Sequence, residues 1–538
     1  MRNKWVQLGI TAMAVSMLAG CISNETPPTS GGSTQEGGGG EAQAITYTFG
    51  RNIDSNADHF VKLQSQFNET LEDNRWTRLF HDELNVNITY NMISDSTAYN
   101  QKLKLAMASG GLPDVFQVQN KSDMRQLMEA GALEDLRPVY DEYASPLLKQ
   151  MIEMETERVF EPVSYKGGLY AIPMKMPSTN FFNHLWIRED WLTNLGLERP
   201  QSIEDVYAIA KAFTFDDPDQ NGQNDTLGMQ LDNGFLSNAK GFFWAFGAYP
   251  DGWVAKDGRA VSGVVQPEMK KPLQMLQQMF KEGLLDKEFG SKDNGKSMES
   301  VAAGKTGMFY GPHWSAFTAE KAIQNNPDAR WIVVPLPGEG GKTVVPNLQI
   351  ANDGFIAVKK GTPQPENIIR MFNLYVEKLF GETAEFDKYY SDSGVDYIWQ
   401  IGPVYTLDSM LDLRAHQEIK QAMTDGTTDQ LTGVSAGFYA NMESGSWPMS
   451  MMFGPKDTPF AYVDQAYPDG VVWDAYMGAP TPTSVARGSS MDELILTTLT
   501  DIVLGRADVD SGFDKMVQEW NTLGGEQMTK EVNDVLAE

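Results

Sequence analysis

Short apolar runs alternate with amphipathic stretches along most of the chain. Runs rich in β-branched and aromatic residues at 45–49, 86–92 and 114–116 predict buried strands. Apolar residues spaced three and four positions apart predict helices between them, at 76–84 and 99–108. Since strands that alternate with helices form parallel sheets covered by those helices, the predicted class is α/β.

Four later segments repeat the helical spacing and carry start or stop signals. Pro200-Gln201-Ser202 opens one helix, and Gly283 and Gly524-Gly525 follow the ends of two others. Their apolar stripes are typical of helices that face a core, so we expect them to pack and not to bind a cofactor. The stripes are Ile203, Val206, Tyr207, Ala210 and Phe213; Met269, Leu273, Leu276 and Phe280; Ile368, Phe372, Tyr375 and Leu379; and Phe513, Met516, Val517 and Trp520.

Residues 1–20 have the features of a secretory signal. Arg2 and Lys4 precede an apolar run from Leu8 to Ala19, which is well short of the ~20 residues that a spanning helix needs. Leu18-Ala19-Gly20-Cys21 resembles the bacterial lipobox, in which the cysteine is diacylated and becomes the first residue after cleavage. The alternative is a chance cysteine beside an ordinary signal. We predict a lipid anchor, with palmitate, on Cys21.

The segment 21–44 is predicted to be a flexible linker. It is rich in Ser, Thr, Pro and Gly and includes the run Gly37 to Gly40. Such a composition buries too little apolar surface to repay the entropy of ordering the chain. The linker is expected to tether a globular body to the lipid, and a plain spacer would have the same composition.

Composition limits the possible partners. The remaining residues are enough for two or three domains, and a single cysteine allows no internal disulfide. The formal charge is −29, and it becomes −31 when Arg2 and Lys4 leave with the signal. No block of Lys and Arg interrupts this acidity, so a nucleic-acid backbone would be repelled.

One local motif predicts a calcium site. Residues 217–225 place oxygen-bearing side chains at positions 1, 3, 5 and 9 of a loop like that of an EF-hand, with Gly222 at the sharp turn. Position 12 is Gly228, so the usual bidentate glutamate is missing; Thr226 is a further candidate for the last ligand. The alternative is an Asx-rich surface loop. The candidate ligands are Asp217, Asp219, Asn221, Gln223 (through its carbonyl), Asp225 and Thr226.

The sequence gives little support to an enzyme. The histidines at 59, 81, 184, 313 and 416 form no zinc pattern, and neither a Gly-x-Ser-x-Gly elbow nor a phosphate loop is present. The acid pair of a glycosidase could still be present among 72 acidic residues. A secreted glycoside-active enzyme is therefore the alternative, and a structural surface lipoprotein is a third class.

An ordered set of segments resembles the family 1 extracellular solute-binding proteins. Ala108 to Val115 is similar to their second-strand turn, and Gly168 to Pro173 is similar to their crossover into the second lobe. Segments typical of the large lipoprotein branch are Ile187 to Leu197, Gly304 to Met308, Phe513 to Lys515 and Leu523 to Gly525.

This resemblance implies a two-lobed fold of the type II periplasmic-binding-protein kind, with a mainly parallel sheet in each lobe and hinge crossovers between the lobes. We expect residues 45–165 with 335–400 to form lobe 1, and residues 166–334 with 401–538 to form lobe 2, which carries the calcium loop. The family implies a monomer outside the cell membrane that captures an oligosaccharide by closing its lobes and delivers it to an ABC permease.

Sugar binding should rest on aromatic faces and polar side chains. Several Trp residues lie near Gly or Pro, where loops that form clefts are expected, and Gln119 and Asn120 follow the third strand, where parallel sheets place ligands. For each Trp the alternative is core packing, which we expect for Trp191 and Trp520. The candidate ligand-binding residues are Trp314, His313, Trp253, Trp244, Trp399, Trp447, Gln119 and Asn120.

Overall fold

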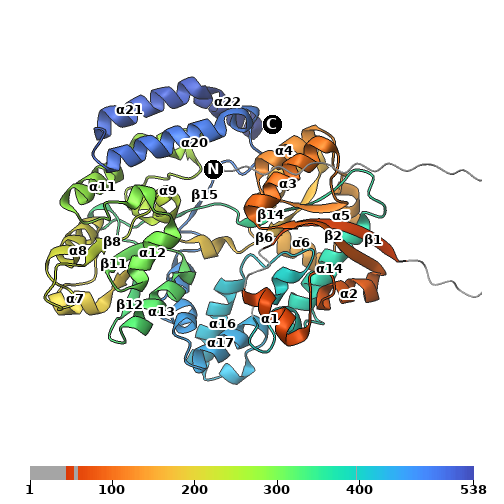
Figure 1. The fold of residues 1–538 in the computed structure, drawn as a ribbon, viewed down its shortest axis with the longest axis horizontal. Helices are drawn as coiled ribbons and strands as arrows, with labels where there is room; N and C mark the ends of the chain where they lie inside the picture. Colours follow the sequence, from red (N-terminus) through yellow and green to blue (C-terminus); the bar gives the residue numbers. More distant parts are fainter. Residues whose placement is uncertain (1–43, 54–57, 396, 538) are drawn as a thin grey trace, which may run out of the picture. The chain divides into compact units, whose positions relative to one another are not determined.

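The computed structural model describes residues 44–53, 58–395 and 397–537 (Figure 1). The predicted signal 1–20, Cys21 and the linker up to residue 43 lie outside the described residues. Within the described ranges, no helix combines the length and apolarity needed to cross a membrane.

Among the described residues, a five-stranded sheet has the order β2-β1-β3-β14-β6. Its strands carry buried apolar side chains, Tyr47 and Phe49 among them, and helices cover both of its faces (Figure 1). The predicted strands and helices near 45, 76, 86, 99 and 115 are confirmed. The strands are β1 (Ile45–Asn52), β2 (Val86–Ser94), β3 (Val115–Val118), β6 (Ala171–Lys175) and β14 (Asn352–Val358).

A four-stranded sheet in the described part has the order β12-β7-β11-β8. Successive side chains of a strand point to opposite faces, and here both faces are buried. In β7, Leu185 and Ile187 join one core, whereas Trp186 between them joins the core on the other face; β11 alternates in the same way. The strands are β7 (His184–Arg188), β8 (Leu227–Met229), β11 (Thr306–Gly311) and β12 (Trp331–Val334).

The α/β class is confirmed, but the expectation of mainly parallel sheets is wrong. In the first sheet β1 runs parallel to β2 and β3, whereas β14 runs antiparallel to both β3 and β6. In the second sheet only the β11–β8 pair is parallel. The antiparallel strands enter from distant parts of the chain, so they need no crossover helix beside them.

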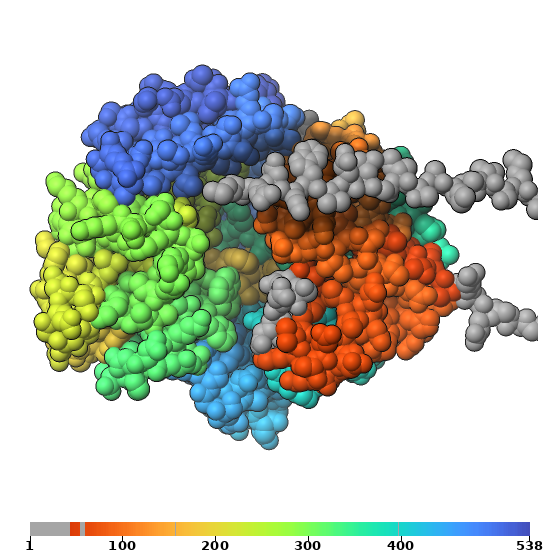
Figure 2. All heavy atoms as spheres, in the orientation of Figure 1, coloured from red at the N-terminus to blue at the C-terminus, as the bar shows by residue number. Residues whose placement is uncertain are grey.

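The helices form three groups. Those beside the first sheet are α1 (Asp58–Phe67), α2 (Arg75–Leu84), α3 (Ser96–Ser109), α4 (Lys121–Glu129), α5 (Arg137–Tyr143), α6 (Pro146–Glu153), α14 (Glu366–Phe380) and α15 (Phe386–Tyr389). Those on one side of the second sheet are α7 (Glu189–Leu195), α8 (Ile203–Phe215), α9 (Phe235–Asn238), α10 (Lys240–Trp244), α11 (Lys270–Glu282), α20 (Pro482–Val503), α21 (Val509–Trp520) and α22 (Glu526–Ala537). Those on its other side are α12 (Asn294–Ala302), α13 (Ala316–Asn325), α16 (Leu411–Asp425), α17 (Gly433–Glu443), α18 (Trp447–Phe453) and α19 (Pro459–Ala466). Figure 2 shows the C-terminal helices, in blue, lying against the green surface that includes α11.

Three segments of the chain lie side by side between the two sheets. One contains Lys175 and Ser178, the second contains Ala351 and the third contains Leu407. The amide of Leu407 donates to the carbonyl of Lys175, and the amide of Ala351 donates to the Ser178 hydroxyl at 3.0 Å. Lys175 and Glu155 form an ion pair at 2.7 Å whose side chains are both fully buried. The predicted border between lobe 1 and lobe 2 at residue 166 is wrong for β6. This strand follows residue 166 in the sequence, yet it pairs with β14 of the first sheet.

Candidate ligand-binding site

A hollow of about 350 Å³ brings aromatic side chains together from distant parts of the chain. We call it the aromatic hollow. Phe181 comes from the 3₁₀ turn η2 (Ser178–Phe181), Trp314 from η6 (His313–Ser315) and Trp399 from η8 (Ile398–Ile401). Its further aromatic and sulfur-bearing lining residues are Met176, Phe317, Tyr390, Tyr397, Phe438, Met449, Met452 and Phe453.

Four of these rings are exposed although each is large and apolar. Phe181 and Trp314 are each 41% exposed, Phe317 is 45% exposed and Tyr397 is 49% exposed. Large exposed apolar side chains that line one concave surface are typical of a binding site, whereas isolated ones are common on any protein surface.

Trp314 is held in place by the chain break before it and by two neighbouring rings. Strand β11 ends at Gly311, and Pro312 starts the short turn that carries His313 and Trp314. The indole meets Phe181 edge to face at 5.5 Å between centroids, and His313 in the same way at 5.0 Å. Both contacts use ring edges, a favoured geometry that fixes the indole without covering it fully.

His313 supports the indole and is electrically neutral. Its side chain is buried, packs on Phe460 at 4.8 Å, and has Nδ1 3.3 Å from the carbonyl oxygen of Asn180. Burial lowers the pKa of His313 to about 3. The imidazole therefore carries no charge at neutral pH.

Asn180, Asp412 and Asn441 place polar side chains among the rings of the aromatic hollow. Asn180 donates through Nδ2 to Asp412, and its Oδ1 is buried without a hydrogen-bond partner among the described residues. Burial, with a smaller contribution from the Asp408 carboxylate, raises the pKa of Asp412 to about 6, although the hydrogen bond from Asn180 lowers it. An unpaired buried oxygen is costly, and Asn180 Oδ1 is itself covered by its neighbours, so it does not open onto the aromatic hollow.

The backbone around Trp399 is fixed by buried side chains of the first core. The Trp76 indole donates to the carbonyl of Ile398 at 3.1 Å, and the Tyr375 hydroxyl donates to the carbonyl of Trp399 at 3.1 Å. Arg51 donates to the carbonyls of Gln400 and Gly402. These bonds hold one wall of the aromatic hollow rigidly.

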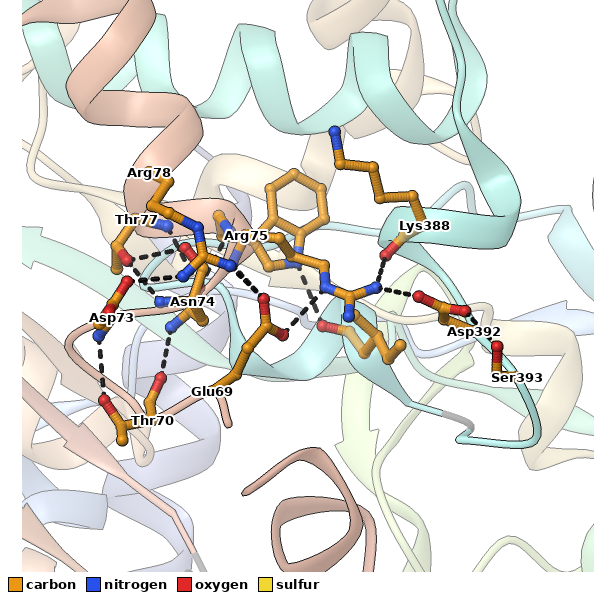
Figure 3. Close-up of polar contacts among 12 residues, drawn as sticks. Glu69, Thr70, Asp73, Asn74, Arg75, Thr77, Arg78, Lys388, Asp392 and Ser393 are labelled. Atoms are coloured by element: carbon orange, nitrogen blue, oxygen red, sulfur yellow. Dashed lines mark hydrogen bonds and ion pairs between the residues drawn. The ribbon is translucent and has the colours of Figure 1, made fainter. Parts of the chain in front are cut away.

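A charged network fixes the neighbouring segment that carries Tyr390. Figure 3 shows Arg75, at the start of α2, donating to the carbonyl of Lys388 and to Asp392, which is 2.9 Å away. Glu69 pairs with both Arg75 and Arg78, and its carboxylate is almost fully buried. A buried carboxylate needs such partners, so the network ties the 388–392 segment to α2.

A second hollow, of about 530 Å³, adjoins the first and shares Phe181 and Trp314 with it. We call it the polar hollow, because amide, hydroxyl and ammonium groups form much of its lining. These are Asn183, Ser237, Asn238, Lys240, Asn294, Ser315, Thr318 and Lys321. Tyr310 of β11 also lines it.

The structure gathers some of the predicted ligand-binding residues and not others. Trp314, His313 and Trp399 all line the aromatic hollow. Trp253 lies in a different hollow, where its amide donates to Asp474 at 2.8 Å. Trp244 is buried beneath Lys240 and lines neither hollow. Trp191 and Trp520 are buried in the core, as expected.

The remaining candidates make local contacts. Trp447 packs against the core formed by Trp186 and Phe309. Asn120 caps helix α4, with its Oδ1 accepting from the amide of Asp123, and Gln119 accepts from the Ser96 hydroxyl at 3.0 Å. None of these three residues lines the aromatic or the polar hollow.

Sequence reasoning missed Phe181, Phe317, Tyr390 and Tyr397. The first follows Pro177, and the last two flank a Ser- and Gly-containing turn. The same association of aromatic residues with chain breaks that singled out Trp314 could have found three of the four. Phe317 lies inside helix α13, where only its exposed side chain distinguishes it from a core residue.

The predicted calcium loop links α8 to β8 and folds around Asn221. Both carboxylate oxygens of Asp217 accept backbone amides, those of Asn221 and Gly222, at 3.0 Å. The Asn221 side chain donates to Asp219 at 2.8 Å and to Asp225 at 3.2 Å. The carboxylates of Asp217, Asp219 and Asp225 therefore all accept hydrogen bonds from Asn221, and Gly222 has the positive φ of 76° that the loop requires.

Lys305 supplies a positive charge to this loop. Its Nζ lies 2.5 Å from Asp225 and 3.9 Å from Asp219. Lys305 lowers the pKa of Asp225, whereas burial raises the pKa of Asp219, whose Oδ1 is buried and has no partner in the part of the chain that the structure describes. Within the described ranges, no three acidic, histidine or cysteine side chains are grouped closely enough to hold a metal ion.

The oxygen atoms of the loop are of the type that calcium prefers, but neither Thr226 nor position 12 of the loop, Gly228, supplies a side-chain ligand. Thr226 is buried and its hydroxyl donates to the carbonyl of Phe213 at 2.8 Å, so the prediction for its side chain is wrong. At Gly228 a Cβ atom would lie 2.2 Å from the carbonyl oxygen of Ala210. This close approach of β8 to α8 explains why position 12 cannot carry a glutamate.

Comparison with known proteins shows one consistent relationship. Residues 61–380 match the family described as bacterial extracellular solute-binding protein. Lipoprotein LipO of Bacillus subtilis (strain 168) is 25% identical over 550 residues, which cover 99% of this chain and 98% of LipO.

Solved structures have the same fold. The alginate-binding protein AlgQ2 without calcium ion has a TM-score of 0.62 at 18% identity, covering 92% of this chain and 98% of that one. An EF-hand mutant of the S. pneumoniae protein FusA, in complex with fructo-nystose, has a TM-score of 0.60 at 16% identity, covering 91% of this chain and 99% of that one.

Proposed function

The chain belongs to the family of bacterial extracellular solute-binding proteins, and from this premise we propose that it captures an oligosaccharide and delivers it to an ABC importer. The observation that carries the proposal is the aromatic hollow, in which Phe181, Trp314, Phe317 and Tyr397 are exposed on one concave surface. The related AlgQ2 is an alginate-binding protein and the related FusA is in complex with fructo-nystose, so both take carbohydrates.

The chemistry of the aromatic hollow suits a sugar ring. Sugars present patches of C–H bonds that pack on the faces of aromatic rings, and hydroxyl groups that need hydrogen-bond partners. Trp314 supplies an exposed ring, and the lining of the hollow also includes the polar residues Asn180, Asp412 and Asn441. We therefore assign sugar contact to Trp314, and a supporting role to His313 and Trp399.

Capture is proposed to occur by closure of two lobes without any change to the sugar. The lobes are those predicted from the sequence, with β6 assigned to lobe 1, and the three crossing segments beside Lys175 serve as the hinge. Closure requires a ligand that favours the closed form. A Cys21 lipid anchor and the tether after it would keep the protein at the outer face of the membrane, near its permease. Cys21→Ser should move the protein from the membrane fraction to the medium.

We also propose that the 217–225 loop binds one calcium ion as a structural staple. Asp217, Asp219, Asn221, Asp225 and the Gln223 carbonyl would hold it. The support is the type of donor atoms that the loop brings to Asn221, together with the Asp219 oxygen that has no partner among the described residues, since a hard cation prefers such oxygen ligands.

A binding and turnover assay tests the proposed function. The purified protein is mixed with graded fructo-oligosaccharides and alginate oligosaccharides; melting temperature is measured first, and the sugars are then recovered and separated by chromatography. We expect at least one sugar to raise the melting temperature and to be recovered intact, because a ligand bound only by the folded state stabilises it. Shortened products above a buffer blank would instead identify a glycoside-active enzyme.

A further inference from the structure

The chain returns to the first core between two parts that belong to the second sheet. Trp473 packs against the core on one face of the second sheet, and Met491 of α20 lies in the core on its other face. Ala479, between them in the sequence, is buried in the first core. The segment between β15 (Val472–Trp473) and α20 therefore spans both sides of the molecule, in addition to the three segments of the proposed hinge. We call residues 474–477 the strap.

Side chains beside the first sheet bind the carbonyl groups of the strap. Arg158 lies in the 3₁₀ helix after α6, and its guanidinium donates to the carbonyls of Asp474 and Ala475, each at 3.1 Å. Lys121, the first residue of α4, donates through Nζ to the carbonyl of Met477 at 3.2 Å. Hydrogen bonds from charged donors are stronger than those between neutral groups, so these three bonds fix the strap to the first-sheet side.

A β-hairpin approaches the same strap from the side of the second sheet. It consists of β9 (Trp253–Lys256) and β10 (Arg259–Ser262), which run antiparallel. The Asn533 side chain of α22 forms two hydrogen bonds with the backbone of Ala260, one to its amide and one to its carbonyl. The hairpin is thereby anchored to the helices beside the second sheet.

Asp474 joins the strap to this hairpin. The residue is 5% exposed, and its Oδ1 accepts from the amide of Trp253 at 2.8 Å, while the amide of Ala475 donates to the carbonyl of Trp253 at 2.8 Å. The rings of Trp253 and Tyr476 also meet edge to face at 6.3 Å between centroids. At Gly252 a Cβ atom would lie 2.6 Å from Asp474 Oδ2, so only a glycine permits this close approach of the hairpin to the carboxylate.

We propose that the strap determines sugar affinity from outside both hollows, because it favours the arrangement of the lobes in which Trp314 and Trp399 line one hollow. Lobe 1 binds the carbonyls of the strap and lobe 2 binds its Asp474 side chain, so lobes that separate must break one of these sets of bonds. Arg158 and Lys121 are positioning residues, since they act on the sugar site only through the strap. This inference rests on the proposed function.

The strap has a consequence for affinity that a direct contact with the sugar would not have. Apparent affinity falls with the fraction of the protein that is in the binding-competent arrangement. Loss of strap bonds lowers this fraction in the ligand-free protein and leaves the contacts between sugar and protein unchanged. The ligand-free molecule should therefore become larger on average, whereas the sugar-bound molecule keeps its size.

The experiment compares Arg158→Gln with the wild type and with Glu161→Gln. Arg158 also pairs with Glu161 at 2.7 Å, so Glu161→Gln removes that ion pair and retains the two bonds from Arg158 to the strap. Lys121→Met removes the remaining bond from a different helix, and it serves as the second variant if Arg158→Gln folds poorly. Solution scattering with and without sugar, melting temperature and calorimetric affinity for fructo-oligosaccharides and alginate oligosaccharides are measured for each protein.

We expect Arg158→Gln to have a larger ligand-free radius of gyration than the wild type and about tenfold weaker affinity for the sugar that binds, as the loss of hydrogen bonds from a charged donor gives. The scattering of its sugar-bound form should superpose on that of the wild type. Lys121→Met should change the radius of gyration and the affinity in the same directions by a smaller amount, and Glu161→Gln should match the wild type in both.

A wild-type ligand-free radius of gyration in both Arg158→Gln and Lys121→Met would overturn the role of the strap. An enlarged form with unchanged affinity would overturn it too, and so would an enlarged form that sugar does not return to the wild-type size. These results would leave the proposed function standing, because sugar would still bind the wild type. Failure of every sugar in both series to bind the wild type would contradict the proposed function itself and, with it, the role of the strap in affinity.

Discussion

At the scale of the residue, Trp314 combines an exposed ring with a fixed position. Pro312 ends the strand before it, and the edges of Phe181 and His313 hold the indole. A tryptophan that served the core would be covered on both faces, as Trp191 is. The side chain therefore contributes more to a ligand than to the stability of the fold.

Trp314→Ala should weaken affinity for the bound sugar at least tenfold, a loss of about 1.4 kcal/mol. Because 41% of the residue is exposed, its melting temperature should fall far less than for a buried Trp, whose replacement costs about 3–5 kcal/mol. Both quantities are measured on the same variant, with Trp191→Ala as the buried comparison. Full affinity at unchanged stability would place the ligand elsewhere.

Asp412 makes stability depend on pH in a defined direction. Burial raises its pKa from 3.8 to about 6, so the folded protein holds this proton to a higher pH than the unfolded chain does. Stability from this group is therefore present at low pH and is lost as the pH rises from about 4 to about 6.

Asp412→Asn should remove that dependence. The melting temperature of the variant, relative to the wild type, should increase between pH 4 and pH 6 and stay constant above. Asp474, whose pKa is also raised to about 6, is present in both proteins and cancels in the difference. A difference in melting temperature that does not vary with pH would show that Asp412 does not titrate in this way.

Lys305 and calcium are expected to compete for the same carboxylates. Excess calcium should raise the wild-type melting temperature relative to chelator, and Asp217→Ala with Asp219→Ala should abolish the rise. Lys305→Gln should lower the melting temperature in chelator and enlarge the calcium-dependent rise, because the carboxylates lose their present counter-charge.

The control for Lys305 is Lys296→Gln, since Lys296 forms an exposed pair with Glu299 at 2.6 Å and does not contact the loop. The calcium proposal would fail if melting curves in calcium and in chelator coincided for both the wild type and Lys305→Gln.

Sequence reasoning located part of the site because chain breaks are visible in the sequence. The Gly311-Pro312 break identified His313 and Trp314 correctly as lining residues. The sequence does not show which side chains are buried. The same reasoning therefore also predicts a ligand contact for Trp244, which is buried in the fold. Asn120 was chosen for its place after β3, where it instead caps a helix.

At the scale of the element, the turn η8 shows how the first core positions the site. Buried donors on β1, α2 and α14 bind successive carbonyls between Ile398 and Gly402. The turn is a short 3₁₀ helix in which the amide of Gln400 donates to the carbonyl of Tyr397 at 3.0 Å, and the long-range bonds satisfy further carbonyls of the same segment. The wall that carries Trp399 is thereby as rigid as the core behind it.

Tyr375→Phe removes one of these bonds and leaves the buried Trp399 carbonyl unpaired, at a cost of about 1–3 kcal/mol. We expect a lower melting temperature and several-fold weaker sugar binding. Tyr99→Phe is the matched control, because Tyr99 is also buried and donates to the carbonyl of Gln117 at 2.8 Å. It should lose similar stability and keep its affinity; equal affinities of both variants would show that η8 does not depend on this bond.

Local patterns predicted most elements but not their pairing. Apolar periodicity identified β1, β2 and β3 and the helices between them, because those signals lie within a few residues of one another. The partners of β14 and β12 lie far away in the sequence, and no local pattern specifies their antiparallel direction. For the same reason β6 could not be assigned to the first sheet in advance.

At the scale of the whole molecule, the sugar proposal depends on segments that are remote in sequence and meet at one hollow. The aromatic hollow takes residues from η2, η6, η8 and α16 to α18, so it exists only when both sheets and their covering helices are folded. The sequence predicted the family and the class of ligand through ordered motifs along the chain. It could not predict the hollow itself, because the hollow is a product of tertiary packing.

The crystal structure of the protein with the oligosaccharide that stabilises it most tests the central claim directly. We expect one sugar unit in the aromatic hollow, with its C–H face against Trp314. A sugar bound against Trp253, or at any position that does not contact Trp314, would contradict the account.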